Sequence, residues 1–537
     1  MRTIDTPQPD ERAAPEFTDA DGARAWLEML PLANAAAAQR SLLAALAAFD
    51  RADVPPAERF AVLEALREAV HYVQIEQAKR FAHRALPMTA AELAVFDATV
   101  ALWELMRTGY RRCIAAAAGG EAPRADRAAL LCQRLLACAG LRMFHHHRAY
   151  RQIPRRDWRA LHEGYAIAER LGVAETPVKD WLNRDVHDTS PRIAWMRAVL
   201  MALANPNELA PRQLTFTAYL LERWAGKVGV SAVPGADEGG APLAVDLAAD
   251  APAQRRPLAG ASVRYLDLTR LARSLRSVIG LMRRGESPAK LGLGEDCVQP
   301  ACERLLAFLY GQWCRGREPR ALERRPAATF AQVSNDLEAI WHYMSGRVFR
   351  QPTEGRELTP LERAELATFG RLSTREEDDY SDARGFLLEH WQIIDESATG
   401  LGLRRPAEAP GRRHAHGELV AVRPADAKAF MLGQLRWLMQ DEAGGLEAGV
   451  RLIPGSVGTC AVRPTGLNAG GARFVPALTL GPLPEAATAP TLILPAGLYR
   501  PKRVIEFRGE SGTRRLMLLE LVERGSDYER VTFRSAD

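Results

Sequence analysis

Two groups of side chains in the second half of the sequence have the types and spacing to bind a charged, planar ligand. The first is Asp395-x-Ser397-x-x-Gly400, which separates two apolar runs in WQIIDESATGLGL. An ionised aspartate can accept two hydrogen bonds from an N–H edge like that of guanine, and a serine can donate or accept. Glycine permits a positive φ and lets a ligand approach the backbone closely. Alternatively, the three residues only close a strand connection through an Asx or Ser/Thr turn.

The second group is a set of arginines upstream of the first. Arg320-x-x-x-Arg324 is followed at once by Arg325 and then by ATFAQVS, whose alternation of apolar and polar residues predicts a strand. The planar guanidinium group pairs with phosphates or with the O6 and N7 atoms of guanine, and it stacks on bases. Taken alone, the arginines could equally form a solvated basic surface.

Together the two groups resemble the PilZ domain, the bacterial receptor module for cyclic di-GMP. That family has R-x-x-x-R before its first strand and D/N-x-S-x-x-G at a later strand connection of a six-stranded barrel. The later segments HGELVAV, FMLGQLRWL and LEAGVRLI are similar to the closing strands of the family. The resemblance covers roughly residues 316–456. It implies that cyclic di-GMP is bound by Arg320, Arg324, Arg325, Asp395, Ser397 and Gly400.

The resemblance also implies a role for each type of residue. The first two arginines would stack on guanine and pair with guanine edges or phosphates, and the third would support them. The aspartate and the serine would hold the base edge, and the glycine would leave room for the base. Such a site recognises a ligand and carries out no chemistry.

A second arginine pair leaves the assignment of the arginine motif open. Arg371-x-x-x-Arg375 ends 20 positions before Asp395, whereas 71 positions separate Arg324 from Asp395. The shorter spacing is nearer to the family pattern. However, Arg375 continues into the acidic EEDDYSD, which would repel a phosphate and does not alternate as a strand. We therefore favour the upstream pair, with an inserted helical segment accounting for the long spacing.

The elements that must position these residues change character along the chain. From about residue 20 to 228, apolar residues recur at helical spacing between short breaks, which predicts a stack of antiparallel helical hairpins. From about residue 316 onward, short alternating segments predict strands. The predicted fold class is multidomain α plus β, with an N-terminal all-α helical hairpin stack and a C-terminal PilZ-like six-stranded β-barrel that carries an extra β subdomain.

The predicted domain boundaries follow from changes in composition. A stretch rich in Gly, Ala and Pro after the helical hairpins predicts a linker. The domains in order are a disordered N-terminus (1–19), a helical domain (20–228), the linker (229–262), a helical connector (263–315), the PilZ-like barrel (316–456) with a helical insertion near 359–373, and a C-terminal β extension (457–537).

Composition limits the classes of partner. The 537 residues carry a formal net charge of +5, too small to predict strong binding to DNA, RNA or a membrane surface. No run of 18 apolar residues predicts membrane insertion, and the N-terminus lacks the apolar core of a signal peptide. The seven cysteines show no C-x-x-C pair, and we interpret them as free thiols of a cytoplasmic protein.

Motifs for catalysis or metal binding are weak. His145-His146-His147 would point in different directions on a helix and has no further ligand at metal spacing, so we expect no metal. Arg423-x-x-Asp426 matches the R-x-x-D of inhibitory cyclic di-GMP sites in diguanylate cyclases, but so short a match is common, and we interpret it as structural. Without a phosphate loop or a nucleophile elbow, we expect no catalytic residue, no cofactor and no enzyme activity.

Two hypotheses of function remain. The first is a signalling effector that binds cyclic di-GMP on the PilZ-like barrel and couples this binding to a helical protein-interaction module, with an unidentified protein as partner. The alternative is a structural adaptor with a degenerate PilZ-like domain that does not bind nucleotide.

Overall fold

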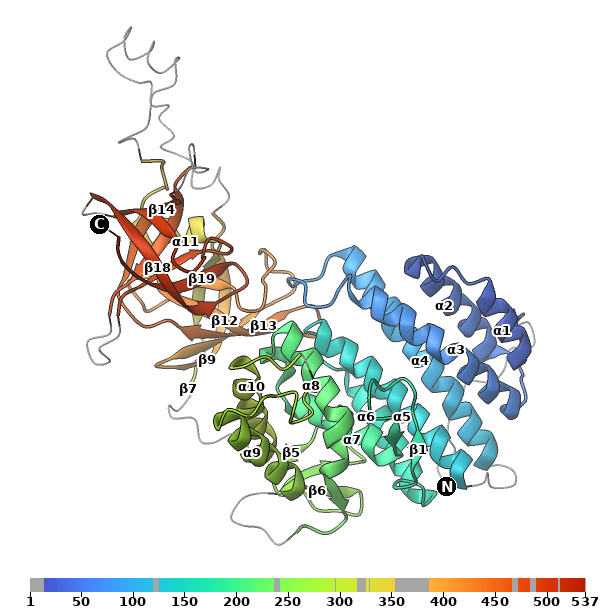
Figure 1. The fold of residues 1–537 in the computed structure, drawn as a ribbon. Coiled ribbons are helices and arrows are strands. Elements are labelled where there is room, and N and C mark those ends of the chain that lie inside the picture. Colours follow the sequence, from blue (N-terminus) through green and yellow to red (C-terminus); the bar gives the residue numbers. More distant parts are fainter. Residues whose placement is uncertain are drawn as a thin grey trace. The chain divides into compact units, whose positions relative to one another are not determined.

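The chain divides into two compact units in the computed structural model (Figure 1). One comprises Met1–Arg84 and Met88–Arg320, and the other comprises Ala85–Pro87 and Ala321–Asp537. The structure describes residues 14–118, 125–235, 242–294, 296–315, 325–327, 329–352, 386–465, 472–482, 489–509 and 512–536. Described helices gather in the first unit and described strands in the second, which confirms the predicted fold class.

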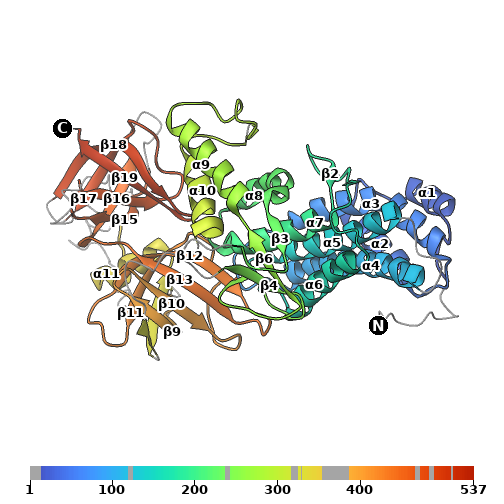
Figure 2. The ribbon, with the colours of Figure 1, turned by 90° about the horizontal axis from the view of Figure 1, so that it is seen from below.

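The first unit begins as the predicted stack of helical hairpins. From α2 onward each helix packs on its neighbours in the chain, whereas α1 packs on α3, and α5 also packs on α7 (Figure 2). Proline in the first turn starts three of these helices, where its missing N–H leaves no hydrogen bond unmade. The helices are α1 (Ala20–Glu28), α2 (Ala35–Arg51), α3 (Pro56–Ala78), α4 (Ala90–Ala118), α5 (Ala125–Arg148), α6 (Arg155–Arg170), α7 (Pro191–Leu203) and α8 (Pro211–Trp224), with the strand pair β1 (Val178–Lys179) and β2 (Asp188–Thr189) before α7.

The stretch predicted as a linker contains strands in this structure. The sheet has the order β3-β6-β4-β5, and Leu243, Val245 and Leu247 are buried in the same core as α7 and α8. The alternation in PLAVDLA is the reason, because it gives a strand with side chains to bury. The elements are β3 (Gly229–Ser231), β4 (Leu243–Asp246), β5 (Gln254–Arg255), β6 (Val263–Asp267), α9 (Thr269–Arg283), α10 (Ala301–Tyr310) and η3 (Gly311–Arg315). The domain boundaries themselves stay predictions.

The interpretation of all cysteines as free thiols is wrong for one pair. Cys297 and Cys302 form a disulfide with their Cα atoms 5.2 Å apart. The chain turns into α10 between them, so residues five positions apart meet without a C-x-x-C pattern. The other five cysteines are free, and burial raises the pKa of Cys113 and Cys314 to about 11.

The second unit contains the predicted six-stranded barrel. Its described strands pair in the order β10-β13-β12-β11-β8-β9, and a further pairing of β9 with β10 closes the ring. The short strand β7 adds to β9 beside this ring. The elements are β7 (Arg325–Pro326), β8 (Phe330–Asn335), α11 (Leu337–Ser345), β9 (Glu389–Ser397), β10 (Gly400–Arg405), β11 (Leu419–Pro424), β12 (Met431–Gln440) and β13 (Leu446–Leu452). The helical insertion predicted near 359–373 lies outside the described residues.

The extra β subdomain is confirmed, and it is itself a closed barrel. Its strand order is β14-β15-β16-β19-β18-β17, and several of these strands lie side by side in Figure 2. The strands are β14 (Val457–Pro464), β15 (Val475–Leu480), β16 (Thr491–Pro495), β17 (Val504–Gly509), β18 (Gly512–Arg524) and β19 (Tyr528–Ser535).

One apolar core joins the two barrels of the second unit. Ile340 of α11 packs with Leu419 and Leu432 of the first barrel and with Leu478 and Ile493 of the second. All five side chains are almost fully buried, so the barrels share core contacts rather than a polar surface. None of the described helices is both long and apolar enough to cross a bilayer.

A half-buried carboxyl group at this junction gives a testable pH dependence. Asp527 accepts a hydrogen bond from the Leu419 N–H (3.0 Å), and burial raises its pKa to about 7, assisted by the charge of Glu418. Its folded-state pKa exceeds the unfolded value of 3.8, so folding stability falls as pH rises through this window.

Asp527→Asn removes the charge and keeps an acceptor. We expect the variant to be about 1–2 kcal/mol more stable than the wild type at pH 8, with a smaller difference at pH 5. Urea unfolding of the full chain at both pH values measures this, with the exposed Asp426→Asn as the control. A difference that does not change with pH would contradict the assignment.

Candidate functional site

The predicted turn motif forms a two-residue β-hairpin. β9 ends at Ser397 and β10 begins at Gly400, and these two residues pair across the hairpin. The Ser397 hydroxyl donates to the Gly400 carbonyl oxygen at 3.2 Å, so the serine closes the turn as the structural alternative predicts. Asp395 lies two residues before this closure, on β9. The motif is therefore held rigidly at one end of the first barrel.

A β-bulge sets the direction of the aspartate and the serine. Leu403 pairs with Ile393 and Gly402 with Asp395, which leaves Ile394 without a cross-strand partner on β10. Paired residues share a face of the sheet, and the Ile393–Leu403 pair is fully buried inside the barrel. The extra residue reverses the alternation beyond it. Asp395 thus shares the outer face with Gly402.

Buried glycines lie on the strands beside the aspartate. On the other side of β10, Gly402 pairs with Gly449 and Gly400 with Arg451 of β13. A Cβ atom at Gly400 would lie 2.6 Å from the Val450 carbonyl oxygen, so this position requires glycine. Gly400 does not have a positive φ, and the expectation that its conformational freedom mattered is wrong. Glycine is needed because the two backbones approach closely.

Two further side chains, Trp437 and Arg451, lie beside these glycines. The Trp437 indole covers Gly449 so closely that a Cβ atom there would lie 2.0 Å from its Nε1 atom. Arg451 donates to Gln434 at 3.2 Å and pairs with Glu523 of the second barrel. Sequence reasoning did not assign either residue to the site, although Trp437 lies in the G-x-x-R-W segment that suggested a closing strand.

Arg325, the last of the predicted arginines, lies beside the hairpin through strand pairing. In β7, Arg325 pairs with Glu396 and Pro326 with Asp395, and the Ala327 N–H donates to the Ile394 carbonyl oxygen at 3.2 Å. Arg325 is exposed. The predicted site residues Arg320 and Arg324, and the alternative pair Arg371 and Arg375, lie outside the described residues.

The shorter R-x-x-D match has a structural role. Arg423 donates to Gln332 at 3.0 Å, and its guanidinium carbon lies 4.6 Å from the centre of the Phe430 ring. Asp426 is exposed. These contacts agree with the structural interpretation of this pair.

A buried charged cluster anchors the start of β9. Glu389 accepts hydrogen bonds from His414 Nε2 (3.0 Å) and Trp391 Nε1 (2.9 Å), and it forms an ion pair with Arg405. His414 also makes a two-bond backbone bridge with Leu86, which is why residues 85–87 belong to this unit. β9 therefore runs from a buried charged cluster at Glu389 to Asp395 and Ser397 at its other end.

Comparison with known proteins matches three parts of the chain. A family model described as the N-terminal domain of the cyclic-di-GMP receptor FimW matches residues 21–235, one described as the middle PilZ domain of that receptor matches 352–457, and one described as the FimW C-terminal beta-barrel domain matches 460–536. The cyclic-di-GMP receptor FimW of Pseudomonas aeruginosa is 22% identical over 559 aligned residues, which cover 95% of this chain and 90% of that protein. The chain is therefore a PilZ-domain protein whose N-terminal, middle and C-terminal parts each match a FimW domain.

Proposed function

We propose that this protein is a signalling effector that binds cyclic di-GMP on the outer face of its first barrel and conveys the binding to a protein partner. The observation that carries the proposal is the arrangement at the hairpin. The bulge at Ile394 turns Asp395 to the same face as Gly402, and β7 places Arg325 alongside β9. The similarity to a protein named as a receptor for this dinucleotide supports the same ligand.

The chemistry of the ligand matches these groups. The Asp395 carboxylate would accept hydrogen bonds from the N1–H and N2–H₂ donors of a guanine. Gly402 places no side chain opposite Asp395, and the Trp437 indole that packs over Gly449 would be available to stack on the base. The arginines would neutralise the two phosphates and stack on the second face of the base.

The position of the arginine segment suggests how binding is conveyed. The boundary between the two units falls between Arg320 and Ala321, so the predicted motif spans the covalent connection. A ligand that fixes this segment against β9 would restrict the arrangements open to the two units. Such a ligand shifts a population toward the arrangement that it binds best.

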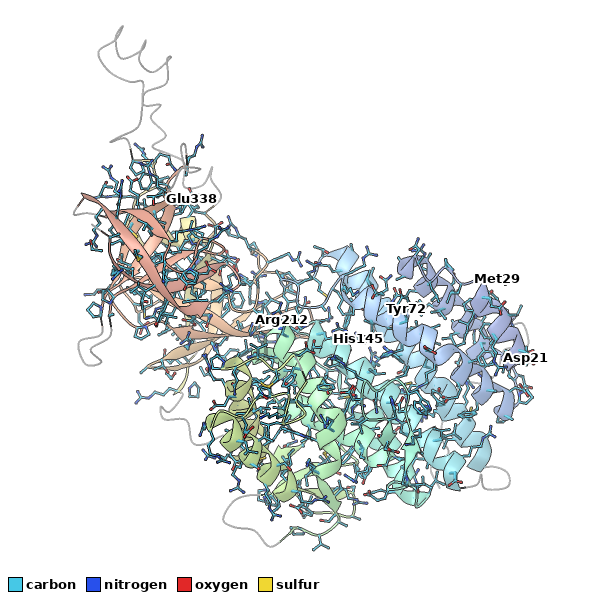
Figure 3. All side chains as sticks on the ribbon, in the orientation of Figure 1. Asp21, Met29, Tyr72, His145, Arg212 and Glu338 are labelled. Atoms are coloured by element: carbon cyan, nitrogen blue, oxygen red, sulfur yellow. A yellow bond between two sulfur atoms is a disulfide. The ribbon has the colours of Figure 1, made fainter. Side chains whose placement is uncertain are left out.

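The helical unit supplies surfaces suited to a partner protein. Met29 and Trp181 are 76% and 69% exposed, and Tyr72 is exposed on α3 (Figure 3). Large apolar side chains left in solvent are the residues that protein interfaces preferentially cover. We propose that the partner binds this unit in the cytoplasm and that the protein itself is not an enzyme.

Calorimetric titration of the full chain with cyclic di-GMP tests the proposal. We expect saturable binding by the wild type and binding about tenfold to hundredfold weaker for Asp395→Ala, because hydrogen bonds to a charged acceptor are lost. Asp426→Ala, another aspartate of the same barrel, is the matched control and should bind as the wild type does. A folded wild type that shows no binding would overturn the receptor function and leave the structural adaptor.

A further inference from the structure

The helical unit contains a cavity that the proposed cyclic di-GMP site does not use. It has a volume of about 380 Å³ and lies among α3, α5, α7, α8 and the loop that follows β1. This volume falls within the range of small-molecule sites. His145 of α5, labelled in Figure 3, is one of its lining residues.

Most of the lining is apolar. Leu141 and Phe144 of α5, Ala198 and Met201 of α7 and Leu221 of α8 contribute to the wall. Water forms few hydrogen bonds with such a wall. An apolar group that binds there is removed from water, which is favourable. The cavity therefore suits a ligand with an apolar body.

One lining arginine has no charged partner. The Arg148 side chain makes no hydrogen bond or ion pair with any residue that the structure describes, and its Nε atom is fully buried. Burial lowers the pKa of Arg148, and the nearest aromatic contact is the Phe144 ring at 5.7 Å. Arg148 is half-buried, and a partly desolvated guanidinium without a counter-charge among the described residues favours the binding of an anion.

The other lining cations are already neutralised. Arg67 donates to both carboxylate oxygens of Asp180 at 2.8 Å. Arg197 donates to Asn183 at 2.6 Å and to Glu222 at 3.3 Å. Arg184 pairs with Asp296 at 3.1 Å, so among the described lining residues the cation without a counter-charge is Arg148.

Neighbouring lining residues add unused hydrogen-bonding atoms. Trp103 Nε1, His145 Nδ1 and His147 Nε2 are buried and have no hydrogen-bond partner among the described residues. Burial lowers the pKa of His147 to about 4 and that of His145 well below its usual value, so both rings are neutral at pH 7. The indole N–H can only donate. Buried polar atoms of this kind normally have a partner.

We propose that this cavity binds a small amphipathic anion, with the anionic group at Arg148 and the apolar body against the α5 and α7 wall. The ligand class is an organic acid with an aromatic or aliphatic body. The inference does not depend on cyclic di-GMP binding, because every lining residue belongs to the helical unit.

Two dyes that differ by one charged group test the site. The probes are 8-anilinonaphthalene-1-sulfonate and its uncharged counterpart, N-phenyl-1-naphthylamine, titrated into the full chain with fluorescence detection. We expect one saturable site for the sulfonate. Arg148→Gln should weaken the sulfonate about tenfold and leave the neutral dye unchanged, because only the charge interaction is lost. Arg212→Gln, which alters an exposed arginine of α8, should change neither.

A second variant tests the location. Gly140 lines the cavity, and a Cβ atom there would meet only Ala198 at 3.6 Å, so Gly140→Leu should fill the space and weaken both dyes. Ala218→Leu is the alternative if that variant does not fold. Arg148→Gln should also raise the melting temperature, since it removes a half-buried charge that has no counter-charge among the described residues. The proposal is overturned if the folded wild type shows no saturable site, if the filled variants bind the sulfonate normally, or if Arg148→Gln affects both dyes equally.

Discussion

Replacing Glu389 with glutamine is expected to destabilise the β-rich unit by about 3–5 kcal/mol. Glu389 is 3% exposed and balances two buried cations, Arg405 and His414. Its second carboxylate oxygen also accepts a hydrogen bond from the Arg412 N–H at 2.6 Å. Glutamine is nearly the same size, so the loss comes from leaving Arg405 buried without this counter-charge and His414 with Glu418 alone, rather than from a cavity.

The same cluster predicts the pH dependence of this loss. Burial opposes the ionisation of Glu389, but the His414 hydrogen bond and the Arg405 charge outweigh it and lower the pKa to about 2. Burial likewise opposes the charge on His414, whereas hydrogen bonds to Glu389 and Glu418 raise its pKa to about 9. The carboxylate stabilises the fold above its unfolded pKa of 4.5, and the imidazolium does so fully below 6.5 and loses its effect as pH rises to about 9.

Urea unfolding of the full chain at pH 6 and pH 9.5 measures both effects. The stability difference between the wild type and Glu389→Gln should be larger at pH 6. Glu447→Gln is the matched control, because Glu447 faces the partly exposed Arg404 at 3.9 Å and should change stability by less than about 1 kcal/mol. A small or pH-independent effect of Glu389→Gln would show that the cluster does not hold β9 in place.

Local pattern predicts the hairpin but not the direction of its side chains. Trp391 and Ile393 alternate as a strand, and Ser397 and Gly400 are turn residues, so the connection could be found from the sequence. Continued alternation from Ile393, however, would place Asp395 on the inner face. The bulge at Ile394 depends on the pairing with β10, and no residue of this segment predicts a bulge from the sequence. The outward orientation of Asp395 therefore depends on both strands, β9 and β10.

Contacts between distant residues escaped sequence reasoning for the same reason. Glu389 and His414 are 25 positions apart, and neither belongs to a recognised motif. The second barrel closes because β14 pairs with both β15 and β17, whereas alternation identifies a strand without its partners. The Cys297–Cys302 disulfide depends on the turn into α10. Each of these features is fixed by tertiary packing.

The arginine motif gives the second large effect, because two segments compete for the role. Arg324→Ala is expected to weaken cyclic di-GMP binding about hundredfold, since a guanidinium group contributes charge, paired hydrogen bonds and stacking. The supporting observation is that the next residue, Arg325 of β7, lies opposite Glu396 of β9 in the strand register, beside Asp395 and Ser397. On the other side, the middle PilZ model begins at residue 352 and so includes Arg375 but not Arg324.

Calorimetry on three variants decides between the segments. Arg375→Ala should bind within about twofold of the wild type, and Arg324→Lys, which keeps the charge but not the planar fork, should lie between Arg324→Ala and the wild type. If Arg375→Ala alone among the alanine variants loses binding, the ligand is confirmed and the motif moves to the segment before β9. That result would also remove the reason for placing the ligand at the connection between the two units, because Arg371 and Arg375 both belong to the second unit, whereas the boundary falls between Arg320 and Arg324. If only the Arg324 variants lose binding, the ligand contacts the residues that connect the two units. Ligand binding would then order that connection directly.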